Sequence, residues 1–167
     1  MRGSSELRFS SLETPIGLVY VVSDGASVVE IAFERPPYPE GHDAGDCAIT
    51  QLKEYFKGER FVFDVAINLA KISTFYTAVY RALREIPYGT VCSYKELAAM
   101  AGSPSAARAV GQAMSHNPIP IILPCHRVIA SDGSLGGYTG GISIKEKLLA
   151  LERQYTGGVK RHGCRFA

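Results

Sequence analysis

The stretch SYKELAAMAGSPSAARAVGQAMSHNP, residues 93–118, decides the fold of the second half of the chain. Ser93 and Glu96 fit a capping box, in which each side chain satisfies a backbone N–H of the other residue. The helix that they start is expected to run to about Ala101 and to end at Gly102, since glycine commonly follows the last helical residue.

A second helix is predicted directly after this one. Ser103 and Pro104 supply an N-cap and a proline at the first helical position, and the helix should end near His116, before Asn117-Pro118. Two short helices around a tight glycine-containing turn outline a helix-turn-helix. Helix hairpins are also common packing devices, so this outline alone leaves the function open.

The composition of the second helix narrows its function. SAARAVGQAM, residues 105–114, is rich in alanine and glycine, and Arg108 is its single long cation. A helix that reads bases in the major groove normally carries several long polar side chains. The pattern favours a close, sequence-indifferent contact, such as one in the minor groove. The alternative is an alanine-rich helix packed on its neighbours, with Arg108 in solvent.

The first part of the chain has a different pattern. Residues 15–34 are two β-rich runs joined at Asp24-Gly25, which predicts a hairpin in an antiparallel sheet. Residues 46–59 follow with one apolar helical face, and residues 60–67 alternate like a strand. We therefore predict an α+β domain over residues 1–70.

The second part is predicted to be mostly helical. Residues 75–86 have helical apolar spacing that stops at Pro87, and residues 145–155 form a further helix. These segments define a second domain over residues 71–157. Residues 158–167 are expected to be a disordered basic tail rather than a metal site.

The net charge of +2 conceals a split between the two parts. Residues 1–70 carry 6 Lys and Arg against 11 Asp and Glu, whereas residues 71–167 carry 12 against 5. A basic surface attracts phosphates through counterion release, so the second part is expected to face a polyanion. An uneven charge distribution without consequence is the alternative.

Length and composition exclude some classes of protein. The chain has 167 residues and is 46% hydrophobic, enough for a folded core. No apolar run approaches the roughly 20 residues needed to span a bilayer, and the N-terminus lacks the apolar segment of a signal peptide. We expect no membrane association and a cytoplasmic protein, or a nuclear one in a eukaryote.

The four cysteines, Cys47, Cys92, Cys125 and Cys164, lack the close pairing of a zinc ribbon. Unpaired cysteines are often buried, and Cys47 and Cys92 are interpreted as core residues. Cys125 differs because it lies in ILPCHRVIASDG, residues 122–133. Its thiol is a candidate for a core residue, a metal ligand or a nucleophile.

The neighbours of Cys125 favour the nucleophile. His126 and Arg127 provide positive charge that favours the reactive thiolate, and Asn117 is a possible orienting side chain upstream. The loop GGYTGG, residues 136–141, has no P-loop spacing and is better interpreted as a wall beside a flat ligand. The apolar run before Cys125 is interpreted as a buried strand.

These residues carry a specific resemblance. PCHRV at 124–128, SYKELA at 93–98, AARAVG at 106–111 and GGYTGG at 136–141 resemble the O6-alkylguanine-DNA alkyltransferase family. The resemblance covers about the last 85 residues before the tail, and the first part of the chain matches only in outline.

The resemblance implies a role for each candidate catalytic residue. Cys125 matches the nucleophile that takes the alkyl group, His126 the base that acts through a water, and Glu152 the acid that orients it. By residue type alone, Glu152 is more often a solvated helix residue. Tyr94 matches the phenol that protonates the departing guanine, and Asn117 the residue that braces the active-site turn.

The resemblance also implies the DNA contacts and a base pocket. Arg108 matches the finger that enters the duplex and replaces the flipped nucleotide. The other residues expected at the DNA are Ala106, Ala107, Ser93 and Tyr94. Those expected at the pocket are Tyr138, Thr139, Gly140, Val128 and Met114.

The implied fold is α+β, with an N-terminal ribonuclease-H-like antiparallel sheet and helix and a C-terminal helical domain of winged helix-turn-helix type. The implied partner of this monomer is alkylated double-stranded DNA, bound through the minor groove with little sequence preference. No cofactor is expected. Some members hold zinc in the first domain, but only Cys47 and His42 are present there, so no metal is expected.

Two other classes remain as alternatives. A binding module would recognise alkylated DNA without repair, or regulate as a helix-turn-helix protein; non-repairing relatives replace the nucleophile, whereas Cys125 is present. A Cys-His hydrolase would have no use for the alanine-rich helix pair.

Overall fold

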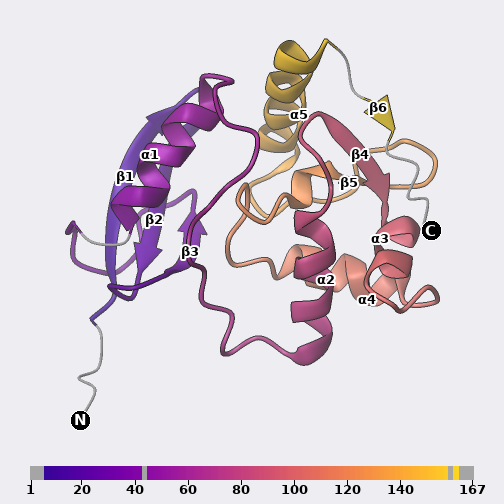
Figure 1. Cartoon of the computed structure of the whole chain (residues 1–167), viewed down its shortest axis with the longest axis horizontal. Coiled ribbons are helices and arrows are strands. Elements are labelled where there is room, and N and C mark those ends of the chain that lie inside the picture. The colour runs from indigo at the N-terminus through magenta and orange to yellow at the C-terminus, as the bar shows by residue number, and fades with distance from the viewer. Residues whose placement is uncertain (1–5, 43–44, 158–159, 162–167) are drawn as a thin grey trace. The chain divides into compact units, whose positions relative to one another are not determined.

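The structure is a computed structural model that describes residues 6–42, 45–157 and 160–161. These residues form five α-helices and six short strands, so the predicted α+β class is confirmed. The chain divides into two compact units, Met1–Ala70 and Lys71–Ala167 (Figure 1). No helix among the described residues is long and apolar enough to cross a membrane.

The first unit contains an antiparallel sheet of β1 (Arg8–Thr14), β2 (Gly17–Ser23) and β3 (Val28–Ala32), in that order. The predicted hairpin at Asp24-Gly25 is confirmed. The Asp24 carboxylate accepts the backbone N–H groups of Ala26 and Ser27, and Gly25 has a φ of 87°. β1 was not predicted, since most of its residues are polar.

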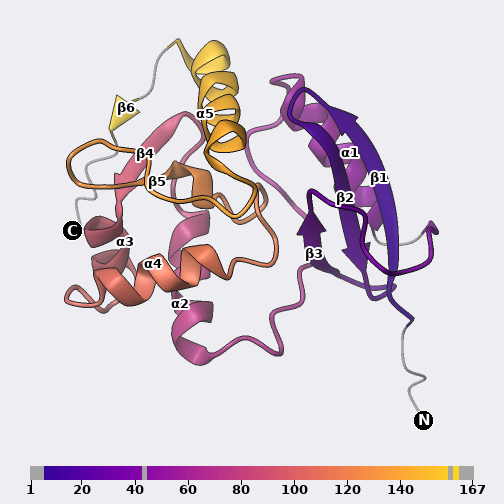
Figure 2. The same ribbon diagram turned by 180° about the vertical axis from the view of Figure 1, so that it is seen from behind.

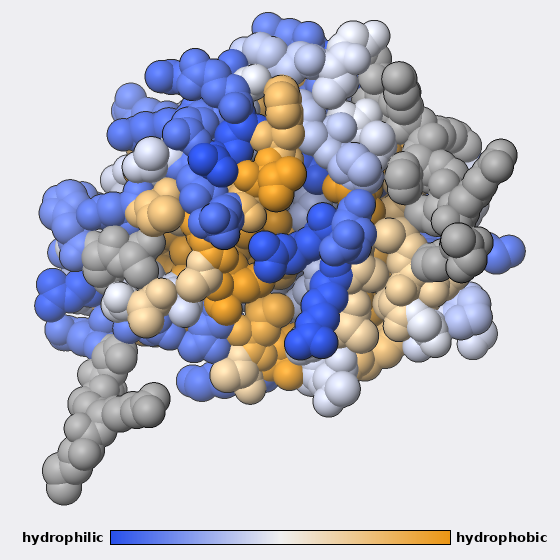
Figure 3. Space-filling view, viewed as in Figure 1, coloured by the Kyte–Doolittle hydropathy of each residue, from blue (hydrophilic) through white to orange (hydrophobic). Residues whose placement is uncertain are grey.

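Helix α1 (Gly45–Phe56) lies on one face of this sheet, in front of it in Figure 1 and behind it in Figure 2. Its predicted apolar face is buried, and its outward side is hydrophilic (Figure 3). Cys47 is exposed, so its interpretation as a core residue is wrong. The residue lies roughly 160° around the helix from the buried Ile49.

Residues 60–67 do not form the predicted strand. The side chain of Gln51 donates to the backbone carbonyl of Asp64 and accepts its N–H, both at 2.8 Å. Only Ile67 makes a β-bridge, with Val28. Because a side chain takes the hydrogen bonds of Asp64, the segment cannot extend a ladder on β3.

The second unit places a small parallel sheet beside packed helices. The strands are β4 (Thr90–Ser93) in the centre, β5 (Val128–Ile129) and β6 (Lys160–Arg161). The helices are α2 (Thr74–Arg84), α3 (Tyr94–Met100), α4 (Ala107–Ser115) and α5 (Ile142–Thr156), with the 3₁₀ turn η1 (Cys125–Arg127). α2, α3 and α4 pack against one another, and α5 packs against η1. The predicted basic tail lies outside the described residues, except for β6.

The helix pair departs from the sequence prediction at one place. The capping box is confirmed, since Ser93 N donates to Glu96 Oε2 and Glu96 N donates to Ser93 Oγ. The prediction that α4 starts at Pro104 is wrong. Ala106 N donates to the Ser103 carbonyl at 2.9 Å, which closes a separate turn before α4 begins at Ala107.

Candidate active site

The Cys125 thiol lies at a pocket of about 350 Å³ in the second unit. The walls of the pocket come from α3, α4, η1 and the loop before α5. The lining residues are Tyr94, Gly111, Met114, Ser115, Cys125, Gly137, Tyr138 and Thr139. Of the residues predicted at the pocket, Met114, Tyr138 and Thr139 line it, whereas Val128 is buried in β5 and Gly140 does not line it.

Sequence reasoning did not place Gly111 or Ser115 at the pocket, and it included Gly137 only as part of the loop 136–141 that it interpreted as a wall. Neither glycine would meet another atom within 4 Å of an added Cβ, so each leaves open space. The small residues of 105–114 indicated a surface for close approach, and nothing in the sequence indicated that Gly111 also faces the pocket.

The apolar run before Cys125 is a buried turn, so its interpretation as a strand is wrong. Pro120 and Leu123 form only an isolated bridge, and Ile121 has a φ of 74°, a conformation that is costly for a β-branched residue. Asn117 bridges the turn: its Nδ2 donates to the Leu123 carbonyl at 2.9 Å, and its Oδ1 accepts Ile119 N–H at 3.0 Å. The strained backbone is therefore held by a side-chain amide.

The environment of Cys125 keeps its thiol protonated at rest. Burial raises the pKa of the thiol to about 11, although hydrogen bonds from Asn117 and Tyr138 and the charge of Lys145 oppose the rise. Since a thiol attacks carbon as its thiolate, this residue needs a base. The cysteine is 3% exposed, so that base must act within the site.

His126 and Glu152 form a buried pair beside this thiol. Their side chains lie 2.7 Å apart, from Nε2 to Oε1, and both residues are 0% exposed. The solvated interpretation of Glu152 is therefore wrong. Burial lowers the pKa of His126, against the opposing effect of Glu152, so the imidazole is neutral. With Nε2 donating to the carboxylate, Nδ1 is the ring atom that accepts a proton.

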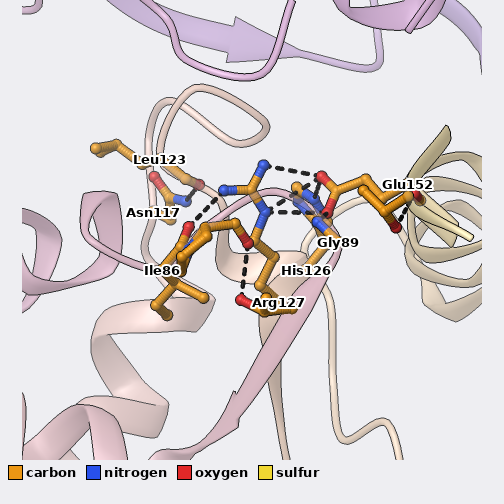
Figure 4. Close-up of polar contacts among 10 residues, drawn as sticks. Ile86, Gly89, Asn117, Leu123, His126, Arg127 and Glu152 are labelled. Carbon is orange, nitrogen blue, oxygen red and sulfur yellow. Dashed lines mark hydrogen bonds and ion pairs between the residues drawn. The ribbon is translucent and has the colours of Figure 1, made fainter. Parts of the chain in front are cut away.

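Arg127 also binds the carboxylate of Glu152 (Figure 4). Arg127 Nη2 donates to Oε1 at 2.9 Å, Nε donates to Oε2 at 3.1 Å, and Gly89 N–H donates to Oε2 at 2.8 Å. Together with His126, these contacts hold the pKa of Glu152 well below its usual value, despite burial. The sequence prediction assigned Arg127 only a general positive charge, because its contact with a residue 25 positions away is invisible in the chain.

Lys145 is a second buried cation that the sequence did not reveal. Its ammonium donates to the carbonyls of Val128, Leu135 and Gly137, and it has no exposed surface. Burial lowers its pKa to about 8. These contacts tie the strand after Cys125 to the loop that lines the pocket.

Tyr94 is the first residue of α3 and lines the pocket, where burial raises the pKa of its phenol. The loop at Gly136 approaches it so closely that a Cβ there would lie 2.7 Å from the phenol oxygen. The φ of 69° at Gly136 also favours glycine. The phenol keeps its proton at neutral pH and is held at the edge of the pocket.

The predicted DNA-contact residues lie at the starts of α3 and α4. Arg108 is exposed in the first turn of α4, and Ala106 and Ala107 are half-buried beside it. Ser93 caps α3 and is half-buried as well. α4 buries Val110, Ala113 and Met114 instead, so Arg108 extends from the face opposite its packed side.

The fold and the site together define a class of protein. Its members hold a buried cysteine at a pocket of about 350 Å³, beside a neutral histidine that is hydrogen-bonded to an ionised glutamate. Comparisons with known proteins make the class specific. Residues 74–154 match the sequence model described as "6-O-methylguanine DNA methyltransferase, DNA binding domain".

Similar proteins extend the match over most of the chain. The methylated-DNA–protein-cysteine methyltransferase of Mycolicibacterium paratuberculosis is 43% identical over 90% of this chain and 94% of its own length. The one from Methanosarcina barkeri is 54% identical over 86% and 96%. The crystal structure of the Mycobacterium tuberculosis O6-methylguanine methyltransferase matches with a TM-score of 0.82, at 40% identity, over 89% of this chain and 94% of that one.

The chain therefore belongs to the methylated-DNA–protein-cysteine methyltransferase family, and the resemblance seen in the sequence is confirmed. A further structure of the Mycobacterium tuberculosis protein is a complex with DNA, with the same TM-score at 41% identity.

Proposed function

We propose that the protein repairs O6-alkylguanine in double-stranded DNA by transferring the alkyl group irreversibly to Sγ of its own Cys125. The observation that carries this proposal is the position of the thiol. It lies at a pocket of about 350 Å³, large enough for an extruded base, and next to the buried pair of His126 and Glu152.

The chemistry follows from the protonation states of the site. His126 accepts the thiol proton through a water, and Glu152 orients and stabilises the imidazolium that forms. The sulfur attacks the alkyl carbon in line, and the bond from that carbon to guanine O6 breaks. Tyr94 donates a proton to the departing base, which neutralises its developing negative charge. Asn117 holds the turn that carries the thiol.

The product explains why each molecule acts once. The thioether on Cys125 has no carbonyl for water to attack, so hydrolysis cannot regenerate the thiol. The damaged DNA supplies the alkyl group, and the reaction consumes no cofactor. No step requires a metal ion.

α3 and α4 support DNA binding through the minor groove. We assign them as the helix-turn-helix of a winged domain over residues 71–157, and residues 1–70 as a ribonuclease-H-like domain. Ala106 and Ala107 permit close approach, Ser93 and Tyr94 begin the first helix at the same surface, and Arg108 occupies the space of the flipped nucleotide. Tyr138 and Thr139 cover the base, with Met114 beside it. We infer a monomer that binds DNA with little sequence preference. Its expected location is the cytoplasm, or the nucleus in a eukaryote.

Mass spectrometry of the intact protein tests the function. After incubation with a duplex that carries one O6-methylguanine, we expect each molecule to gain one methyl group, mapped to Cys125 by peptide digestion. The same duplex with guanine is the matched control and should add no mass. Tight binding without mass gain would instead identify a recognition module, and repeated turnover would identify a hydrolase.

Arg108→Ala is expected to slow repair of duplex DNA by on the order of tenfold or more, because unstacking a base costs a few kcal/mol that the arginine offsets. Transfer from the free base O6-methylguanine, which needs no flipping, should change little. Single-turnover rates on both substrates measure this difference. Arg153→Ala removes the same charge from an exposed position on α5 and serves as the control. Equal losses on duplex and free base would contradict the role of Arg108.

A further inference from the structure

Two adjacent residues bind the same buried carboxylate. His126 contacts Oε1 of Glu152, while Arg127 contacts both carboxylate oxygens and binds the group as a fork. The three side chains are at most 6% exposed. The catalytic scheme uses His126 and Glu152 but gives Arg127 no task.

The charge balance of this cluster determines what His126 can do. A buried glutamate with no other cation would attract a proton to the neighbouring imidazole, since an opposite charge favours the charged form of histidine. An imidazolium cannot accept the thiol proton. The guanidinium of Arg127 is always charged, so it balances the negative charge of Glu152 without a proton on His126.

We propose that Arg127 is a positioning residue that neutralises Glu152 and so keeps His126 uncharged and able to accept the proton of Cys125. This inference rests on the proposed function, in which His126 is the base. It goes beyond that function because it holds that Arg127, which does not touch the substrate, determines the protonation state of the base.

The contacts on the other side of Arg127 fix it in this position (Figure 4). Its Nη1 donates to the Ile86 carbonyl at 2.7 Å, and its guanidinium lies 5.6 Å from the ring centroid of Tyr88. Burial raises the pKa of Tyr88 to about 12, so that ring carries no competing charge. Arg127 therefore cannot leave Glu152 without breaking contacts with the segment before β4.

The other groups around His126 do not replace Arg127. From α5, Lys145 adds a positive charge that also opposes an imidazolium, and Glu152 favours one. Cys125 and Tyr138 are neutral, because burial raises the pKa of both. Arg127 is the cation that binds Glu152 directly, so its replacement should change the charge of His126 most.

NMR titration of the histidine ring nitrogens tests the proposal without any need for activity. In Arg127→Gln, which keeps a hydrogen-bond donor but no charge, we expect the His126 midpoint to rise by roughly 1 to 3 pH units relative to the wild type. Arg127→Lys keeps the charge and should restore a midpoint near that of the wild type. The His126→Asn spectrum assigns the signal.

The pH profile of single-turnover transfer gives a second readout. The rate should fall on the acid side as His126 becomes protonated, and this fall should move to higher pH in Arg127→Gln but not in Arg127→Lys. Arg127→Met retains an apolar stem against Tyr88 and is the second neutral variant if Arg127→Gln does not fold. The inference would be overturned if the His126 midpoint did not change in the folded neutral variant. It would also be overturned if Arg127→Lys had the same His126 midpoint as the neutral variant. A wild-type protein that transfers no alkyl group would overturn the proposed function, whereas the titration would still test Arg127.

Discussion

Cys125→Ser is expected to lose alkyl transfer by on the order of a thousandfold or more, because a serine hydroxyl is a far weaker acid and nucleophile than a thiol. The site already raises the pKa of the thiol to about 11 through burial. A hydroxyl in the same place remains protonated, and His126 cannot deprotonate it. Serine is close to cysteine in size and can keep the hydrogen bonds with Asn117 and Tyr138.

This variant should lose single-turnover transfer but keep DNA binding. We expect Cys125→Ser to bind the O6-methylguanine duplex about as tightly as the wild type, because neither Arg108 nor the pocket walls change. Cys47→Ser is the matched control, since Cys47 is exposed on α1 and lies in the other unit. Persistent methylation of Cys125→Ser, or its loss in Cys47→Ser, would show that the nucleophile is another group.

Local signals made the helices predictable. The capping box at Ser93 and Glu96 involves residues three apart, and the apolar face of α1 repeats at helical spacing, so both depend on neighbours in the sequence. The prediction of a strand at 60–67 is wrong because the side chain of Gln51, on a helix, takes the backbone hydrogen bonds of Asp64. Alternating apolar residues indicate a strand only when the backbone is available for pairing.

The active site was predictable in part for a related reason. Cys125 was favoured as a nucleophile because histidine and arginine follow it and positive charge favours the thiolate, and the family resemblance then assigned it that role. The tasks of Arg127 and Lys145 depend on partners that fold toward them from far along the chain, namely the Glu152 carboxylate and the loop carbonyls. The turn at Ile121 was mistaken for a strand because apolar composition records burial but not backbone conformation.

Glu152→Gln is expected to lower the free energy of unfolding by about 3 to 5 kcal/mol at neutral pH. The amide has nearly the same shape but no charge, so it leaves the Arg127 guanidinium buried without its counter-ion. An amide oxygen in place of Oε2 still accepts from Gly89 N–H. The NH2 group in place of Oε1 cannot accept from His126 or Arg127, so the variant loses these hydrogen bonds together with the charge. Urea denaturation of both proteins at pH 7 measures the difference.

The dependence of this difference on pH distinguishes the charge from the packing. Because Arg127 and His126 hold the pKa of Glu152 in the folded state below its usual value of 4.5, the unfolded chain binds the proton more readily. The stabilisation is fully present above pH 4.5 and is lost as the pH falls from there toward the lower folded-state value. The wild type should therefore approach Glu152→Gln in stability under acid. Glu146→Gln, an exposed position on the same helix, should change little at either pH. A cost at Glu152 that stays constant between pH 7 and the acid range would mean that packing, not charge, holds this carboxylate in place.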